Sequence, residues 1–562
     1  MATESTTASI SAEERKVIFA SSLGTVFEWY DFYLYATLAP FFAGLFFPKG
    51  NATAALLSAL ATYAAGFLVR PFGALLFGRV GDLVGRKYTF LVTITVMGIS
   101  TFAVGLLPTY GSVGVLSPLL LTVLRLLQGL ALGGEYGGAA IYVAEHSRPD
   151  RRGLSTSWIQ TTATLGFLMS LIIILVCRVS FAEDAFKAWA WRIPFWASLV
   201  LLIFSIYIRL KLYESPVFLR MKEEGRVSKK PLTESFLRYP NNKYVFLALF
   251  GAVAGQGVVW YTGQFYALFF LTGTLKLDFI TAYILIGIAL VIGTPLFLVF
   301  GKLSDRIGRR KIILAGCLIA AVTYFPVFKN LTHFANPALE EFTEKTAISV
   351  AAEDCQFHIF SFPNTEYTQC DRVKDFLTRA GVSFKSEPAV PGKAVVTKIG
   401  ETVIEGWQLE GGKDAPKTGA SADDPRFLDA LADKGYPGSA KKVVDGKAKV
   451  TLGGADKSRI NYPMVLLILV FLIVLVTMVY GPIAALLVEL FPAKIRYTSL
   501  SLPYHLANGW IGGMLPLVAT AMAAGAGNIY YGLWYPVVVA VLTVVVGGLF
   551  LHDPKPDFDI HA

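Results

Sequence analysis

Charged residues are scarce in this sequence of 562 residues, where Asp, Glu, Lys and Arg together make up only 16%. A soluble globular chain carries about 25%. Hydrophobic residues account for 54% and the mean hydropathy is +0.55. This balance excludes an ordinary soluble domain and predicts a protein built mainly within a lipid bilayer.

Motifs of ATP-driven pumps and of common enzymes are also missing. The chain has no GxxxxGK[ST] phosphate loop, and the apolar part has no HExxH, paired CxxC or GxSxG. We therefore expect no enzymatic activity, no cofactor and no metal site. The net charge of +10 does not indicate nucleic-acid binding, because the basic residues lie in short loops between apolar runs.

Apolar runs of roughly 20 residues, enough for a helix to cross about 30 Å of hydrocarbon, recur along the chain. Residues 1–14 are polar, so we expect the first apolar stretch to remain as a spanning helix rather than be cleaved as a signal peptide. The predicted spans are 17–47, 54–77, 88–108, 115–143, 154–177, 189–209, 244–271, 280–300, 312–328, 462–488, 498–523 and 529–551.

Lysine and arginine are distributed unevenly between the two sides of these spans. Basic clusters at 79–87, 148–152, 209–243 and 302–311 all fall on one side. The short loops of the other side contain only Lys49, Arg178, Lys187 and Lys276. Cytoplasmic loops are enriched in basic residues, so this pattern predicts that both termini are cytoplasmic.

The chain also repeats itself, since GRVGDLVGRK at 78–87 recurs as GKLSDRIGRRK at 301–311. Both copies follow the second helix of a six-helix half, which predicts two parallel halves and alternating access about a central site. The expected divisions are 1–209 and 244–329 with 461–551 for the two halves, 210–243 for a cytoplasmic linker, and 552–562 for a tail. The matching residues are Gly78, Asp82, Gly85 and Arg86, and Gly301, Asp305, Gly308 and Arg309.

A polar segment at 330–460 interrupts the second half and is expected outside the cytoplasm. CDRVKDFLTRAGVSF predicts a short amphipathic helix, and KAVVTKI, ETVIEGWQ and KVVDGKAKVTL predict strands. We expect a small α/β domain. Cys355 and Cys370 would lie in an oxidising compartment, which favours a disulfide over two free thiols.

These motifs resemble a known family. GRVGDLVGRK and its repeat resemble the signature loop of the major facilitator superfamily, and LRLLQGLALGGEYGGA at 124–139 resembles its fourth-helix motif. FEWYDFYLYATLAPFF, WRIPFW, ESPVF and ELFPAKIRYTSLSLPYHLANGWIGG resemble the metabolite–proton symporter branch. The resemblance implies the all-α twelve-helix fold and a monomer in the cell inner membrane that moves a small polar metabolite with protons. The 330–460 insert departs from that branch.

Ionisable side chains within spans are costly and are functional candidates. Glu28 and Asp31 lie three residues apart in the first span, on one helix face. Two carboxylates this close do not ionise together readily, so the pair is a candidate for proton coupling; the alternative is a structural salt bridge. Arg125 in the fourth span is a candidate for binding an anion, assisting proton transfer or pairing with either acid. Glu135 is assigned equally to coupling and to a structural pair.

Polar and aromatic residues of three further segments are substrate candidates, although some of them will only join helices. His505 can titrate near neutral pH, and a packing histidine is an equal alternative. Arg70, which precedes Pro71, is expected to be a gate or packing residue. The candidates for substrate binding are Tyr30, Tyr33, Arg125, Gln128, Gln256, Tyr261, Gln264, Tyr266, His505 and Asn508.

The repeated loops are predicted gates. Asp82 and Asp305 can each cap a neighbouring helix N-terminus or pair with Arg86 or Arg309, and such contacts hold one access state. The leading hypothesis is proton symport of an organic acid. Zwitterion transport, export or exchange, a membrane sensor and a membrane enzyme are the alternatives; the internal repeat favours transport over the last two.

Overall fold

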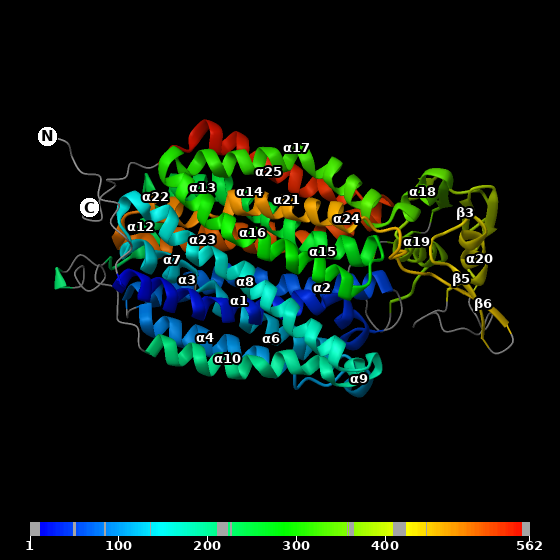
Figure 1. The fold of residues 1–562 in the computed structure, drawn as a ribbon, viewed down its shortest axis with the longest axis horizontal. Helices are drawn as coiled ribbons and strands as arrows, with labels where there is room; N and C mark the ends of the chain where they lie inside the picture. The colour runs from blue at the N-terminus through cyan, green and yellow to red at the C-terminus, as the bar shows by residue number, and fades with distance from the viewer. Residues whose placement is uncertain are drawn as a thin grey trace.

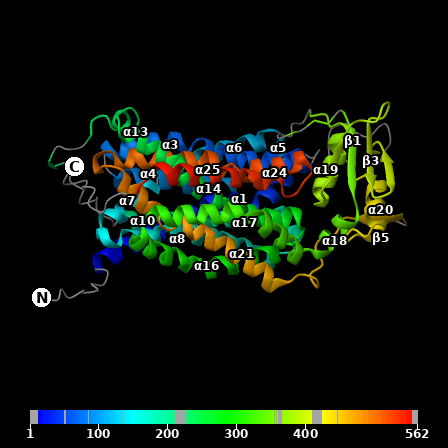
Figure 2. The same ribbon diagram turned by 90° about the horizontal axis from the view of Figure 1, so that it is seen from above.

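The protein is a long helical bundle with a small mixed domain at one end (Figures 1 and 2). A computed structural model describes residues 12–48, 52–83, 86–134, 136–210, 223–224, 228–353, 355–356, 358, 365–408, 423–444 and 447–553. The long helices run along the longest axis of the molecule, and the insert caps the end where α9 and α24 lie (Figure 1). The end opposite the insert carries α7, α12, α22 and α23 (Figure 1).

The first half of the chain forms the predicted six-helix unit. The motif GRVGDL ends α3, and a turn at Val69 separates α3 from α2 inside one predicted span. The helices are α1 (Ala12–Phe46), α2 (Ala52–Leu68), α3 (Arg70–Leu83), α4 (Arg86–Val104), α5 (Tyr110–Val113), α6 (Leu116–Gly133), α7 (Tyr136–Glu145), η1 (Pro149–Arg151), α8 (Arg152–Ser180), α9 (Glu183–Ala188), η2 (Ala190–Arg192) and α10 (Ile193–Leu210).

The second half is the matching unit, interrupted by the insert. Its ninth span continues to Ala335, beyond the predicted end at 328. The helices are α12 (Pro231–Phe236), α13 (Asn241–Ala248), α14 (Ala254–Tyr261), α15 (Ala267–Phe269), α16 (Phe279–Ile307), α17 (Arg309–Ala335), α21 (Tyr462–Tyr480), α22 (Ile483–Leu490), η7 (Ala493–Ile495), α23 (Arg496–His505), α24 (Leu515–Ala526), η9 (Tyr531–Leu533) and α25 (Trp534–Phe550).

Most of the predicted spans meet the requirements of a bilayer. Within the described residues, 10 helices are long and apolar enough to cross a membrane. The other two predicted spans coincide with α1, which has 35 residues, and with α4, whose apolar part is Leu91–Val104. Large apolar side chains such as Val322 and Leu549 face outward from the bundle, as expected where lipid surrounds the helices.

Two spans of the second half contain π-helical turns. The seventh span, Asn241–Thr274, holds η3 (Leu249–Val253), η4 (Thr262–Tyr266) and η5 (Phe270–Thr274). The eleventh span holds η8 (Leu506–Gly513). Such turns are uncommon and occur frequently at functional sites. Here they contain Gln264, Tyr266 and Asn508, three of the predicted substrate contacts.

The insert is the predicted small α/β domain. Its four-stranded sheet has the order β2-β1-β3-β4, with β1 parallel to β2 and antiparallel to β3. The predicted strands appear as β3 to β6, whereas β1, β2 and the helices α18 and α20 were not predicted. The elements are α18 (Pro337–Lys345), β1 (Ile348–Ala352), α19 (Gln369–Ala380), β2 (Lys385–Glu387), β3 (Val395–Ile399), β4 (Thr402–Glu405), α20 (Pro425–Asp433), β5 (Ala440–Val444) and β6 (Lys447–Thr451).

The predicted amphipathic helix of the insert, α19, lies between the bundle and the sheet (Figures 1 and 2). Thr368 and Asp371 form a capping box at its start, and Gly381 ends it in the left-handed conformation. Its apolar face buries Phe376 against Phe427, with ring centres 5.7 Å apart. Cys370 in its first turn forms a disulfide with Cys355, and the two Cα atoms are 5.0 Å apart.

Candidate functional site

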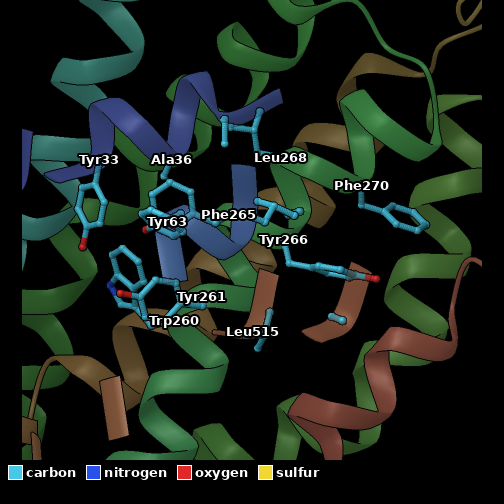
Figure 3. Close-up of a cluster of buried hydrophobic side chains, with 14 of the residues drawn as sticks. Tyr33, Ala36, Tyr63, Trp260, Tyr261, Phe265, Tyr266, Leu268, Phe270 and Leu515 are labelled. Carbon is cyan, nitrogen blue, oxygen red and sulfur yellow. The ribbon is translucent and has the colours of Figure 1, made fainter. Parts of the chain in front are cut away.

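An aromatic layer joins the two halves midway along the bundle. Tyr33 of α1 stacks on Trp260 of α14 with ring centres 5.4 Å apart, and Tyr63 of α2 lies 6.3 Å from Phe265 of η4. Figure 3 shows these rings facing one another, with Tyr266 and Phe270 farther along the seventh span. The first-helix motif and the seventh span therefore meet at one place, although more than 200 residues separate them in the sequence.

Two fully buried arginines lie against this layer, and both contact the ring of Phe32. The guanidinium carbon of Arg70 is 4.2 Å from the centre of the Phe32 ring, and that of Arg125 is 4.5 Å from it. Arg125 donates to Gln128 Oε1 over 2.5 Å. Nε and Nη2 of both arginines have no hydrogen-bond partner within the described parts of the chain. Both guanidiniums thus keep donors available in a buried, ring-lined place.

Arg70 occupies a position that its sequence context did not reveal. It begins α3 of the first half, and it approaches the Tyr261 hydroxyl and His505 of the second half. A Cβ on Gly509 would lie 3.9 Å from the Cβ of Arg70. The arginine is therefore held at the boundary between the halves, where the prediction had been a gate or packing residue.

The predicted polar contacts of the second half divide into two groups. Gln256 and Asn508 exchange amide hydrogen bonds of 3.1 and 3.0 Å, so in this conformation each satisfies the other. Gln264 instead donates to Thr164 of the first half over 3.3 Å. His505 is buried, and neither ring nitrogen has a partner in the described region. Gln264 and His505 are therefore the members placed between the halves.

The four predicted tyrosines also lie in different surroundings. Tyr33 and Tyr261 belong to the aromatic layer (Figure 3). Tyr266 packs on Phe328 with ring centres 5.6 Å apart. The Tyr30 hydroxyl donates to the carbonyl of Pro194 over 2.7 Å, so it joins α1 to α10 inside the first half and is directed away from the layer.

The acid pair of α1 is buried, as predicted for a coupling site. Glu28 and Asp31 are 1% and 5% exposed. Asp31 faces Ser198 of α10 as well as Glu28, so the pair lies between helices of one half. No ion pair joins Arg125 to either acid among the residues described, because Arg125 contacts Gln128 and the rings of Phe32, Tyr35 and Tyr63. Arg125 is therefore not the salt-bridge partner of the acid pair in this conformation.

At the end opposite the insert, Asp305 performs both of the roles predicted for the motif acid. Its carboxylate accepts the backbone N–H groups of Gly153 and Leu154 over 2.8 and 3.0 Å, which caps the N-terminus of α8 in the other half. It also pairs with Arg309 over 2.8 Å. The second copy of the motif is thus a direct connection between the two halves.

Glu489 extends this connection into an ionic network. Its carboxylate pairs with Arg309 over 2.9 Å and with Arg152 of the first half over 3.6 Å. A second cross-half pair joins Arg496 to Glu145 over 3.3 Å. Glu489 and Arg152 were not predicted. Glu489 is a single acid at the end of an apolar run, Arg152 is one of several bases at the start of α8, and they lie 337 residues apart in the chain. The network closes this end of the bundle.

The motif glycines act through close approach and backbone conformation. A Cβ on Gly301 would lie 2.5 Å from the Cβ of Ser157 on α8, so this glycine allows the two halves to touch. Gly308 has φ +101°, a backbone conformation that residues other than glycine rarely adopt. In the first copy, a Cβ on Gly78 would contact Tyr497 at 3.4 Å. The side chains of Asp82 and Arg86, together with Gly85 and Glu135, lie outside the described residues.

Comparison with known proteins agrees with this architecture. A family model described as sugar (and other) transporter matches residues 16–235. The chain is 38% identical over 339 residues to the inner membrane metabolite transport protein YhjE of Escherichia coli K12, a match that covers 58% of this chain and 74% of that protein. It is 34% identical over 323 residues to the shikimate transporter of the same organism, covering 56% and 72%.

A further relative and a solved structure also match this chain. The chain is 36% identical over 328 residues to the proline/betaine transporter of Escherichia coli K12, covering 56% of this chain and 64% of that one. A partially occluded, inward-open structure of the Escherichia coli xylose transporter XylE superposes with a TM-score of 0.59 at 14% identity and covers 97% of this chain and 99% of that one. At this identity the superposition establishes the fold alone.

Proposed function

The chain belongs to the sugar and metabolite transporters of the major facilitator superfamily, and from this premise we propose that it imports a small organic acid by proton symport. Membership makes it a multi-pass inner-membrane transporter rather than an enzyme. The substrate, the coupling ion, the direction of transport and the roles of individual residues belong to the proposal. Relatives named as shikimate and proline/betaine transporters support a small polar solute.

The observation that carries the proposal is the pair of buried arginines. Burying a cation without an anionic partner is costly, and both Arg70 and Arg125 retain unpaired donors beside the aromatic layer. A guanidinium matches a carboxylate with two parallel hydrogen bonds. A carboxylate solute between the halves supplies the missing partner, and Gln264 and His505 lie close enough to the same boundary to orient its remaining polar groups.

Glu28 and Asp31 are the proposed proton carriers. Two buried carboxylates on one helix face favour sharing a proton. They lie on the α1 helix that also carries Phe32 and Tyr33 of the substrate region. Movement of α1 when the solute binds would change how easily the pair holds its proton, which couples the two events through one helix.

Alternating access follows from the ionic network and the positions of the two halves. The Asp305 and Glu489 contacts hold the end opposite the insert closed, so separating them is the step that opens this end. The basic loops support a cytoplasmic location for that end and for both termini. The insert is then extracytoplasmic, and Cys355 and Cys370 lie in an oxidising compartment.

A zwitterion is the second candidate substrate, favoured by the aromatic layer. Faces of tryptophan and tyrosine attract quaternary ammonium groups. Tyr33 stacks on Trp260 and on Trp29, and the guanidinium carbon of Arg70 lies 5.9 Å from the centre of the Trp29 ring. Betaine would place its carboxylate on an arginine and its methylated nitrogen on a ring. The two candidates differ in their dependence on the rings, because an organic acid requires only the arginines.

Uptake by purified protein in lipid vesicles tests the proposal. Radiolabelled α-ketoglutarate, citrate, shikimate, proline and betaine are each supplied with and without an imposed inward proton gradient. We expect accumulation of at least one carboxylate that disappears when an ionophore collapses the gradient. Gradient-independent exchange alone would indicate an exchanger, accumulation under an outward gradient an exporter, and no movement of any solute would favour a sensor. Any of these results would overturn proton-driven import.

A further inference from the structure

A cavity lies between the insert and the bundle. Its volume is about 650 Å³, within the range of about 300–1,000 Å³ typical of small-molecule sites. The ends of α1 and α2 form one wall, the end of the seventh span and α24 form another, and α19 of the insert covers it. Both halves and the insert therefore contribute to a single, partly open cavity.

The inner end of this cavity is the aromatic layer. On α2, Leu60 lines the cavity and Tyr63, one helical turn further on, belongs to the layer. On the seventh span, Tyr266 lines the cavity and the adjacent Phe265 belongs to the layer (Figure 3). A solute leaving the cavity toward the other end of the bundle would meet these rings first and Arg125 next.

The two basic residues that line the cavity, Arg379 and Lys276, differ in their acidic partners. Arg379 of α19 is satisfied by two acids, because it donates to Asp375 over 3.0 Å and to Asp423 over 2.6 Å. Lys276 also lines the cavity, and its ammonium donates to the carbonyl of Gly273 over 2.5 Å. Lys276 has no acidic partner within the described residues. Its charge is therefore the one that a bound anion would neutralise.

The backbone at Lys276 is held in an unusual conformation. With φ 61°, it is the one non-glycine residue of positive φ in the described parts of the chain, and such strain persists where surrounding contacts impose it. The contact here comes from the insert, since Ala455 donates its N–H to the carbonyl of Lys276 over 2.9 Å. Burial and the nearby charge of Arg379 also lower the pKa of the Lys276 ammonium to about 8.

We propose that this cavity is an outer binding site for a small organic carboxylate, held by Lys276 beneath the insert before the solute passes the aromatic layer. The inference rests on the proposed function for the identity of the transported solute, but the site itself is defined by the cavity and its unneutralised lysine. A carboxylate there would pair with an ammonium that is otherwise partly buried beside another cation.

The insert completes this site and is attached mainly to the second half. Phe384 donates its N–H to the carbonyl of Gly527 over 2.8 Å on one side of the cavity. On the other side, Asp375 accepts the N–H of Thr53, in the first turn of α2, over 2.8 Å. The insert thus covers the cavity. Its hydrogen bond to the first half, between Asp375 and Thr53, must break when the halves separate at this end.

Protection of Lys276 from acetylation tests the site. Full-length protein in lipid nanodiscs is treated with a water-soluble acetylating ester, and each lysine is followed by mass spectrometry with and without succinate or choline. We expect succinate to slow acetylation of Lys276 about tenfold and to leave Lys393 unchanged, because Lys393 is exposed in the insert and pairs with Glu405. Choline lacks a carboxylate and should protect neither lysine.

Two variants separate this proposal from the proposed function. R125K should raise the half-saturating concentration for uptake at least tenfold and retain succinate protection of Lys276, because the inner and outer sites are distinct. K276Q should raise the half-saturating concentration for uptake about tenfold, whereas K393Q should match the natural protein. Unchanged acetylation of Lys276 in succinate, or equal protection by choline, would overturn the outer site. Protection that persists in protein that transports no carboxylate would reject the proposed function and leave the site standing.

Discussion

Asp305 accepts the backbone N–H of Gly153 over 2.8 Å, which joins the repeated loop of the second half to the start of α8 in the first half. The same carboxylate accepts the N–H of Leu154 and pairs with Arg309. Unsatisfied N–H groups at a helix N-terminus favour an anion, so a single side chain stabilises the helix end, its own loop and the closed end of the transporter.

Replacing Asp305 by asparagine should open the end opposite the insert. The amide keeps the size of the side chain but loses the charge-assisted bonds, each of which contributes about 1.5–3 kcal/mol. A loss of about 1.4 kcal/mol raises the ratio of molecules open at this end to molecules closed there tenfold. We expect a cysteine introduced at the buried Ser501, whose neighbour is Gly137 of the first half, to react about tenfold faster with maleimide in D305N.

Asp553 provides the matched control for this prediction. It accepts the N–H of Arg310 over 2.8 Å at the start of α17, so it is also an acidic helix cap. This contact joins the second half to the tail that follows it and does not cross between the halves. D553N should weaken that contact and leave the reactivity of the Ser501 cysteine unchanged. Equal labelling in D305N and the natural protein would contradict the role assigned to the cap.

The residues of this connection show what could be predicted from the sequence. The repeat identified Asp305 and Arg309 because acid, base and glycine recur at constant spacing in both halves. Glu489 has no such counterpart, and it ends an apolar run in which one acid carries no periodic signal. Its partners Arg309 and Arg152 lie 180 and 337 residues away in the chain, so only the packing of the two halves reveals them.

The role of Arg70 and parts of the insert could likewise not be predicted from local sequence pattern. Arg70 follows a break between α2 and α3, and its contacts are Phe32, Tyr261 and His505, which come from three other segments. Local periodicity did find α19 and the strands of β3 to β6, because alternating or amphipathic patterns are visible there. The strand β1 lies in the middle of the sheet and has no alternating polar residues, so its pattern did not distinguish it.

Solute uptake should require the planar guanidinium groups of the two buried arginines as well as their positive charge. Lysine keeps the positive charge but cannot form two parallel bonds to a carboxylate. R70K and R125K should each raise the half-saturating concentration for uptake at least tenfold, as expected for losing one charged hydrogen bond. R192K is the control, since Arg192 lies over Trp191 and bonds to the Leu107 carbonyl within the first half. An effect in R192K as large as in R125K would reject the assignment.

Reporter fusions should define the orientation of the bundle. An alkaline phosphatase fused near residue 400, in the insert, is expected to be active, because that enzyme requires an oxidising compartment. The same reporter fused near residue 225, in the basic linker, is expected to be inactive, and a fluorescent protein at that position should give the reverse pattern. Cytoplasmic behaviour of the fusion near residue 400 would refute the twelve-span topology.

Cys355 and Cys370 should be bridged in protein taken from its native membrane. Alkylation in denaturant without a reductant is expected to label Cys177 and Cys317, which are free and buried, and to leave the bridged pair unlabelled. The free thiols therefore serve as an internal control. A bridge that closes 15 residues stabilises the folded state by about 3 kcal/mol in the chain-entropy model, so replacing both cysteines by serine should lower the melting temperature of the insert and leave the bundle folded.

Neutralising Glu28 or Asp31 should abolish accumulation against a gradient while the protein continues to fold. Arg125 donates to Gln128 rather than to either acid, so E28Q and D31N should not leave Arg125 as a buried cation that has lost its ion-pair partner. If one acid carries the proton, its variant should still exchange solute across the vesicle membrane, because exchange does not require the proton to be released and taken up again.

E183Q, which loses an exposed pair with Lys187, is the control and should accumulate solute normally. Failure of both accumulation and exchange, together with poor expression, would indicate a structural role instead. Gradient-driven uptake at the natural level in both E28Q and D31N would refute the assignment and direct attention to Glu135 or His505.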